Sequence, residues 1–150
     1  MRTSAGILLY RSKGHEPEVF LVHPGGPFWK GKDLGAWSIP KGEYINEEPL
    51  AAAKREFKEE TGYALTGKFI ALTPIKQKAG KLVQAWAVEG DIDADTIVSN
   101  SFETEWPPKS GRKQNFPEVD KAAWFTIDHA REKINPAQTA FLDELVLMIT

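Results

Sequence analysis

Residues 46–62 constrain the fold more than any other part of the chain, because they carry the signals of one capped amphipathic helix. Asn46 is a suitable N-cap, and Pro49 fits a first helical turn. Gly62 is typical of the position just beyond a helix C-terminus, where a left-handed backbone is common. These signals predict a helix over about residues 47–60.

The faces of this helix differ in their chemistry. One stripe is apolar and consists of Leu50, Ala53 and Phe57. Another sector holds three acids, Glu56, Glu59 and Glu60, whereas the lysines lie mostly on a different face. Residues three and four apart on a helix are neighbours, so each acidic pair costs about 0.2–0.5 kcal/mol unless a positive charge lies between its members.

Two interpretations of this acidic sector are open. It is either a solvated helix face softened by nearby basic residues, or a site for a divalent cation. The helix is preceded by the sequence WSIPKGEY, a strand followed by a Pro-Lys-Gly turn, which is unlike a plain linker and favours the cation site. Converging carboxylates with no thiol or imidazole prefer hard ions, so this interpretation predicts Mg²⁺ or Mn²⁺.

Most of the remaining chain alternates between β-rich runs and turn signals. The predicted strands are, in chain order, residues 4–11, 18–24, 36–40, 67–77, 81–92 and 122–127. The first two form a hairpin, and the pair at 67–77 and 81–92 is antiparallel around a Lys-Ala-Gly-Lys turn. Strands flanked by substantial helices predict a single α/β domain over residues 1–150, built as a sandwich around one mixed sheet.

Two further segments complete this prediction. Residues 93–121 are rich in Asn, Ser, Pro, Gly and charge, and they are too long for a passive connector, so we expect a functional or mobile loop. Residues 137–149 carry Phe141, Leu145 and Met148 at helical spacing. This pattern predicts a second helix that packs its apolar face on the core.

Composition excludes several classes of function. The chain has no cysteine, and its three histidines, His15, His23 and His129, lack the spacing of metal ligands, which argues against zinc. A net charge of −2 with dispersed Lys and Arg argues against binding of extended nucleic acid. No apolar run is long enough for a membrane span or signal core. We therefore expect a cytoplasmic protein, either a monomer or a homodimer, that has no membrane partner.

The sequence GEYINEEPLAAAKREFKEETGY, residues 42–63, resembles the Nudix box, the signature of hydrolases that cleave a nucleoside diphosphate linked to another moiety. The C-terminal half of the box is met by Arg55, Glu56, Phe57, Glu59, Glu60 and Gly62, although Phe57 and Tyr63 replace aliphatic residues. The first half is one residue short, so either Glu47 or Glu48 fills its first glutamate. On the helical wheel Glu47 points away from the acidic sector, which suggests a structural role.

The resemblance implies an α/β/α sandwich and a divalent metal site. It implies that Glu56, Glu59 and Glu60 bind the ions, that Arg55 holds one of these glutamates in place, and that a backbone carbonyl of Lys41 or Gly42 adds a ligand. Such an ion suits the reaction, because it neutralises the negative pyrophosphate oxygens and activates the attacking water. Glu59 and Arg55 are accordingly expected to take part in catalysis.

Family members often place a further glutamate in the loop before the last strand. Glu118 stands six residues before Trp124 and is our candidate for an extra ligand or general base, with Glu103 and Glu105 as rivals. Any one of these loop glutamates could equally be a solvated surface charge.

Substrate contacts are expected from two loops. Lys109, Arg112 and Lys113 place three cations in one short stretch that could grip phosphate oxygens, or could only aid solubility. In the loop at residues 25–35, Trp29 could stack on a base, or could cover an edge of the core. The resemblance favours a Mg²⁺-dependent hydrolase acting on a nucleoside triphosphate or a dinucleoside polyphosphate. The alternative is a non-catalytic Nudix module that binds a nucleotide or a protein partner.

Overall fold

A computed structural model describes residues 2–12, 14 and 16–150 of the chain. The predicted first hairpin is confirmed, because β1 (Thr3–Arg11) and β2 (Glu18–Pro24) pair antiparallel. His15 and Lys13 lie outside the described residues. The central sheet is mixed and has the strand order β4-β6-β1-β2-β9, where β4 is Ile70–Ala71, β6 is Leu82–Glu89 and β9 is Val119–Thr126. In this order β1 and β6 run parallel.

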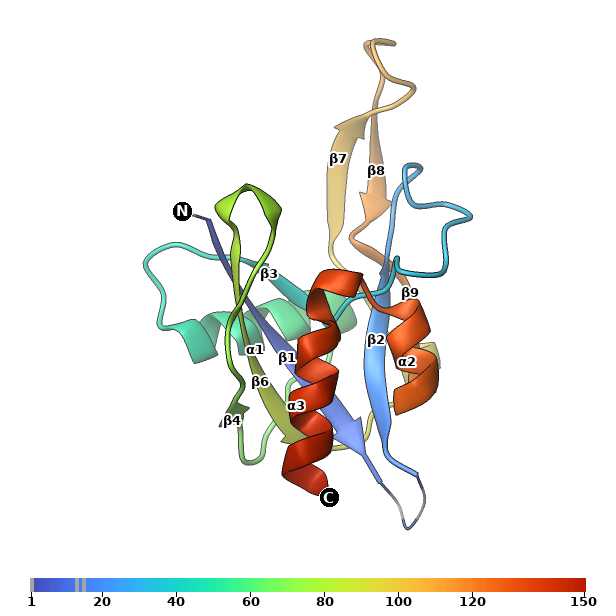
Figure 1. Ribbon diagram of the computed structural model, residues 1–150. Helices are drawn as coiled ribbons and strands as arrows, with labels where there is room; N and C mark the ends of the chain where they lie inside the picture. Colours follow the sequence, from blue (N-terminus) through green and yellow to red (C-terminus); the bar gives the residue numbers. More distant parts are fainter. Residues whose placement is uncertain (1, 13, 15) are drawn as a thin grey trace.

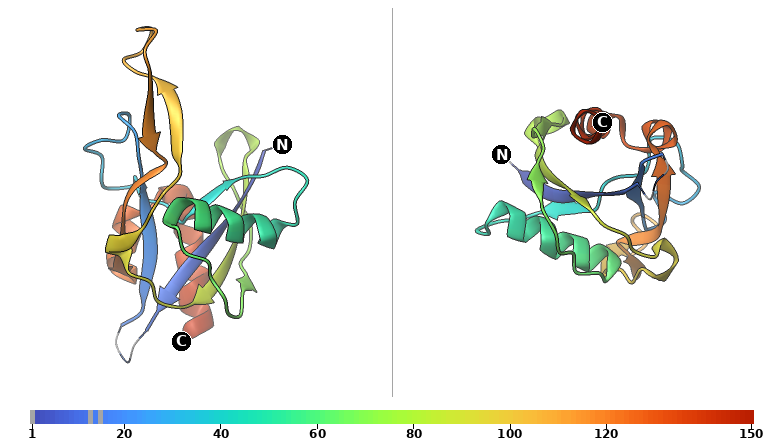
Figure 2. Two further views of the ribbon diagram at one scale, coloured as in Figure 1. Left: turned by 180° about the vertical axis from the view of Figure 1, so that it is seen from behind. Right: turned by 90° about the horizontal axis from the view of Figure 1, so that it is seen from below.

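Helices cover both faces of this sheet (Figures 1 and 2). Along β1, Ile7 and Leu9 are fully buried in the layer under α1 (Pro49–Thr61), and Leu8 is fully buried in the opposite layer. The second layer contains α2 (Ile127–Lys133) and α3 (Thr139–Ile149). Because successive strand residues point to opposite faces, both faces of β1 must be apolar. The predicted α/β/α sandwich with a mixed sheet is confirmed.

The N-terminus of α1 differs from the prediction. The N-cap is Glu48, whose carboxylate accepts from the backbone N–H of Ala51 at 3.2 Å, and the first helical residue is Pro49. Asn46 instead has a positive φ of 56° and lies in the turn before the helix, so its predicted role as N-cap is wrong. The predicted end of the helix is nearly right, because Gly62 adopts the left-handed conformation after Thr61.

Residues 36–40 do not form the predicted third strand. They make only isolated bridges, from Ser38 to Val22 and from Trp37 to Ile134. The short strand lies further on, at β3 (Lys41–Glu43), which pairs antiparallel with β1. This pairing brings the start of α1 against the sheet.

The predicted antiparallel pair after α1 is confirmed in shorter pieces. β4 (Ile70–Ala71) and β5 (Ile75–Lys76) both pair antiparallel with β6, and a short 3₁₀ turn, η1 (Lys78–Gly80), separates β5 from β6. A second 3₁₀ turn, η2 (Ala94–Thr96), follows β6.

Residues 93–121 were predicted as one long functional or mobile loop, but part of this segment is β-structure. They contain a separate two-stranded hairpin, β7 (Ser101–Glu105) with β8 (Lys113–Pro117), which projects from the body of the molecule (Figure 1). The last strand of the main sheet, β9 (Val119–Thr126), begins earlier than predicted and pairs with β2. Short polar strands carry little alternating hydrophobicity, which explains why the sequence pattern did not reveal this hairpin.

The C-terminal part contains one helix that was not predicted. α2 follows β9 directly and begins at an N-cap, Thr126, and η3 (Pro136–Gln138) joins α2 to α3. The predicted C-terminal helix is confirmed as α3, which buries Phe141 and Leu145 against the sheet. Among the described residues, no helix has both the length and the apolar character needed to cross a membrane.

Candidate metal and nucleotide site

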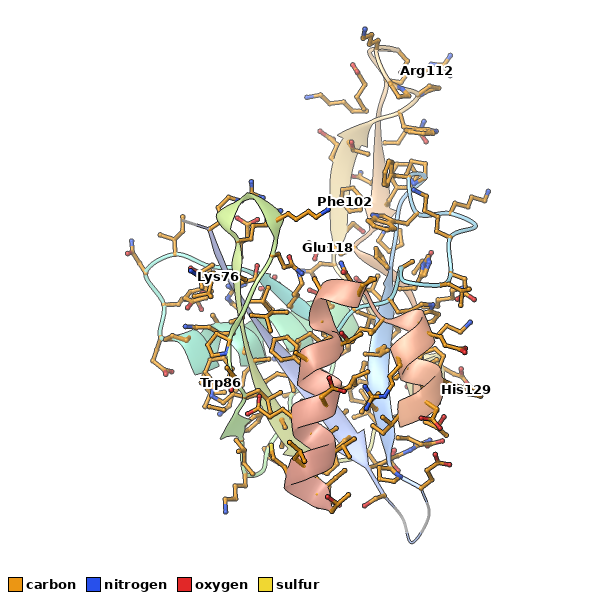
Figure 3. The ribbon with its side chains drawn as sticks, in the orientation of Figure 1. Lys76, Trp86, Phe102, Arg112, Glu118 and His129 are labelled. Carbon is orange, nitrogen blue, oxygen red and sulfur yellow. The ribbon has the colours of Figure 1, made fainter. Side chains whose placement is uncertain are left out.

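Three carboxylates converge where the end of α1 meets the start of β9. Glu56, Glu60 and Glu118 each offer an oxygen atom within 4.8 Å of the other two. Glu56 and Glu60 are one helical turn apart on α1. Glu118 joins them from the link between β8 and β9, and Figure 3 shows it at the base of the hairpin. The structure thus brings together two predicted ligands from the helix and the predicted glutamate from the distant loop. We call these residues the carboxylate cluster.

The cluster concentrates negative charge away from water. Glu56 and Glu60 are only 8% and 6% exposed. Burial and the carboxylates of Glu56 and Glu118 raise the pKa of Glu60 to about 9. Burial and the nearby Glu59 also raise the pKa values of Glu56 and Glu118. Without a cation, the cluster therefore holds protons that exposed glutamates would lose.

Gly42 and Lys41 form the wall behind the cluster. A Cβ atom at Gly42 would lie 2.2 Å from the Cδ atom of Glu56, so only glycine leaves room for this carboxylate. The backbone N–H of Lys41 donates to the carboxylate of Glu60. Burial lowers the pKa of the Lys41 ammonium group. Coordination by the carbonyl of Lys41 or Gly42 stays a prediction.

Arg55 links the remaining glutamates of the motif. Its guanidinium donates to Glu47 at 2.6 Å, to Glu56 at 3.0 Å and to Glu59 at 2.7 Å. These bonds, first of all the one to Glu47, raise the pKa of Arg55. Part of the acidic crowding on α1 is thus relieved by Arg55 itself, as the interpretation of a face softened by nearby basic residues predicted. Glu59 turns toward Arg55 and lies outside the group of three carboxylates.

Glu47 lies before α1, so the helical wheel did not apply to it. Its carboxylate pairs with Arg55 through both oxygens, and this pair anchors the loop that leads into the helix. Glu48, the other candidate for the first glutamate of the motif, caps the helix.

Glu118 is held in place by its backbone. Its N–H donates to the carbonyl of Asn100 at 2.7 Å, and its carbonyl accepts from the N–H of Gly25 at 2.8 Å.

The two rival glutamates lie elsewhere on the hairpin. Glu105 accepts from the backbone N–H of Lys109 at 2.8 Å, and Glu103 lies 3.9 Å from the ammonium group of Lys113.

A cavity of about 280 Å³ opens beside the cluster, and we call it the metal-side cavity. Its lining includes Glu60, Glu118, Lys41 and the predicted stacking residue, the half-buried Trp29. Sequence reasoning missed four polar residues in the same lining, namely Ser38, Gln77, Asn135 and Gln138. Gln138 is fully buried, where its amide bonds to the backbone of Ile39 and the hydroxyl of Ser38. Its NPAQ sequence context, a turn signal, gave no sign of this role.

The predicted phosphate-binding cations are not part of this cavity lining. Lys109, Arg112 and Lys113 lie at the exposed end of the β7–β8 hairpin, and Figure 3 shows Arg112 at the tip and Glu118 below its base. Their contact with a substrate stays a prediction.

The donor set of the cluster fits a hard divalent cation. Its members supply carboxylate oxygens alone, and among the described residues no histidine belongs to such a group. Mg²⁺ and Mn²⁺ prefer these ligands, whereas zinc sites generally use imidazole or thiolate. Buried carboxylates that are forced together without a cation are costly, so the arrangement itself favours cation binding.

Solved structures with the same fold come from several sources. The chain superposes on a *C. elegans* Ap4A hydrolase in a binary complex with a TM-score of 0.69 and 19% identity, covering 97% of each chain. The NUDIX domain of *Shewanella oneidensis* NrtR, complexed with ADP ribose, gives a TM-score of 0.66 and 14% identity, covering 99% of this chain and 88% of that one. At these identities the likeness is one of fold.

Sequence comparison identifies the family. A relative from *Acanthamoeba polyphaga mimivirus*, named "Putative mRNA-decapping protein", is 28% identical over 122 residues. That alignment covers 73% of this chain but only 29% of the viral protein. The family model described as NUDIX domain matches residues 1–145, which is nearly the whole chain. The protein is therefore a member of the Nudix family.

Proposed function

We propose that the protein is a Mg²⁺-dependent hydrolase of a nucleoside diphosphate linked to another moiety. The substrate would be a nucleoside triphosphate or a dinucleoside polyphosphate, and water would attack one phosphorus. One observation carries this proposal: two buried carboxylates, Glu56 and Glu60, and the half-buried carboxylate of Glu118 converge beside a cavity that also contains an aromatic side chain, Trp29.

The carboxylate cluster would hold the ion, together with a backbone carbonyl of Lys41 or Gly42. When bound, a divalent ion neutralises charge on phosphate oxygens and lowers the pKa of coordinated water. Arg55 would keep Glu56 and Glu59 fixed, because its guanidinium bonds to both. Glu59 would then add negative charge to the rim of the site, and this charge would favour the site with a divalent cation bound over the empty site.

Glu118 is our candidate for an extra metal ligand or for the general base. It is half-buried, it lines the cavity, and burial raises its pKa, so it is a better proton acceptor than a solvated glutamate. Its backbone is held on both sides, which would keep the carboxylate in position during turnover.

The substrate class is supported by what the relatives are named for. Ap4A, ADP ribose and the mRNA cap all contain a phosphate chain between a nucleoside and another group, which is the chemistry that a carboxylate-bound cation recognises. Trp29 would stack on a base, and Lys109, Arg112 and Lys113 would attract the phosphate chain.

A substrate panel tests the proposal. The protein is incubated with ATP, diadenosine tetraphosphate, ADP ribose or a cap dinucleotide, with Mg²⁺ or with EDTA, and products are identified by chromatography. Glu56→Gln, Glu60→Gln and Glu118→Gln should each lower kcat at least about 100-fold on the best substrate. Glu132→Gln, an exposed carboxylate on α2, is the matched control. Wild-type rates in all three variants would overturn the proposal, and binding without turnover would favour the non-catalytic module.

A further inference from the structure

A second cavity, of about 610 Å³, lies between the β7–β8 hairpin and the loop at residues 25–35, and we call it the hairpin cavity. Its lining includes Pro27, Lys30, Trp106, Phe116 and Asp120. This volume is within the range of pockets that enclose small ligands and exceeds that of the metal-side cavity. None of the roles assigned above uses the hairpin cavity.

The two cavities share a wall that contains Glu118. In the link between β8 and β9, Glu118 and Val119 line the metal-side cavity, while Pro117 and Asp120 line the hairpin cavity. The opposing loop is divided in the same way. Pro24 and Trp29 line the metal-side cavity, whereas Gly26, Pro27 and Lys30 line the hairpin cavity. A ligand whose middle part lies at Glu118 can therefore place one end in each cavity.

The shared wall is tightly built. A Cβ atom at Gly25 would lie 1.9 Å from the carbonyl oxygen of Pro117, and one at Gly26 would lie 2.9 Å from the ring of Phe102. These glycines allow the loop to pack directly against the hairpin. The ring of His23 adds a further link, because its nitrogens lie 2.9 Å from the carboxylate of Asp120 and 2.6 Å from the carbonyl of Lys32. The hairpin cavity is thus formed before any ligand binds.

The lining chemistry suits an aromatic ring attached to phosphate. Trp106 is half-buried, and its backbone is fixed by bonds to Arg112 and to the side chain of Gln114. A half-buried indole ring that lines a cavity offers a stacking platform for a base. Lys30 adds a positive charge to the lining, on the loop that also carries Trp29. This charge complements a phosphate chain that runs between the two cavities.

We propose that the hairpin cavity binds the second nucleobase of a dinucleoside polyphosphate, stacked on Trp106, while the phosphate chain lies at the carboxylate cluster. This inference rests on the proposed function and narrows its substrate class. A nucleoside triphosphate has no group that reaches the hairpin cavity, so Trp106 discriminates between the two kinds of substrate.

Binding measurements test this without relying on turnover. Calorimetry compares a methylene-bridged analogue of diadenosine tetraphosphate with the methylene-bridged ATP analogue, both resistant to hydrolysis, in the presence of Mg²⁺. Trp106→Ala should weaken binding of the dinucleoside about 5- to 150-fold and leave binding of the ATP analogue unchanged. Trp106→Phe keeps an aromatic face and should retain most of the affinity. Leu34→Ala, an exposed residue elsewhere on the same loop, is the control.

Melting curves show whether each variant is folded. If Trp106→Ala does not fold, Lys30→Glu is measured in its place. Lys30→Glu should weaken binding of the dinucleoside analogue more than binding of the ATP analogue. Equal weakening of both ligands, no weakening of either, or wild-type protein that binds the dinucleoside no more tightly than the ATP analogue would overturn the inference. If selective weakening is found but no substrate is hydrolysed, the hairpin subsite stands and the proposed hydrolase function fails.

Discussion

Replacing Glu60 by glutamine should make the metal-free protein less sensitive to pH. Glu60 has a pKa of about 9 in the folded protein, against 4.5 for an ordinary glutamate. Between these values the folded state keeps a proton that the unfolded state has lost. The stabilisation is therefore fully present below about pH 4.5 and is lost as the pH rises toward 9. A glutamine cannot titrate, so this loss should disappear in Glu60→Gln.

The size of the effect follows from linkage. One extra proton in the folded state lowers the free energy of unfolding by about 1.4 kcal/mol for each pH unit. For a chain of this length, that corresponds to roughly 3–6 °C in Tm per pH unit. Because Glu56 and Glu118 interact with Glu60, the protons belong to the cluster as a whole, and these figures are upper values for Glu60 alone.

The assay is the Tm in EDTA, measured at intervals from about pH 5.5 to 8.5, for the wild type, Glu60→Gln and the exposed control Glu132→Gln. The Tm of Glu60→Gln should exceed that of the wild type by a margin that grows with pH, while the control follows the wild type. Parallel curves for the wild type and Glu60→Gln would refute a strongly raised pKa at Glu60 and the crowding that explains it.

Three further predictions concern single residues. Gly42→Ala should displace the Glu56 carboxylate, because its Cβ atom would lie 2.2 Å from the Cδ atom, and Mg²⁺ should then no longer raise the Tm. Phe57→Ala should lower the free energy of unfolding by about 3–5 kcal/mol in urea titrations, since the side chain of Phe57 is fully buried between α1 and the sheet. Arg112→Ala should raise KM on the best substrate with little change in kcat, if the hairpin tip only positions the phosphate chain. Unchanged values of KM and kcat would remove Arg112 from the site.

Sequence periodicity was sufficient for the elements that carry a strong apolar pattern. One or two continuous apolar faces are buried by each of β1, β2, α1 and α3. The succession of strands and helices along the chain predicts a layered α/β fold. The pattern failed where burial is slight. α2 is only seven residues long, and the β7–β8 hairpin is largely exposed, so neither has an apolar stripe long enough to recognise.

The candidate site was predictable in part. Glu56 and Glu60 lie one turn apart on a single helix, so helical geometry alone places them together. Glu118 reaches Glu56 and Glu60 only because β9 pairs with β2, and local sequence does not encode this long-range pairing. It could therefore be proposed only from the family resemblance. The lining amide of Gln138 and the hairpin cavity depend on contacts between distant segments, which explains why local sequence patterns did not reveal them.

A Mn²⁺-soaked crystal, measured at an energy where manganese scatters anomalously, tests the central claim most directly. We expect one strong anomalous peak between the carboxylates of Glu56, Glu60 and Glu118, at ligand distances close to the 2.0–2.1 Å that is usual for Mg²⁺. The peak should be lost in Glu60→Gln and retained in Glu132→Gln. Peaks found only at other acidic residues, or an unchanged peak in Glu60→Gln, would contradict the assignment of this cluster as a divalent cation site.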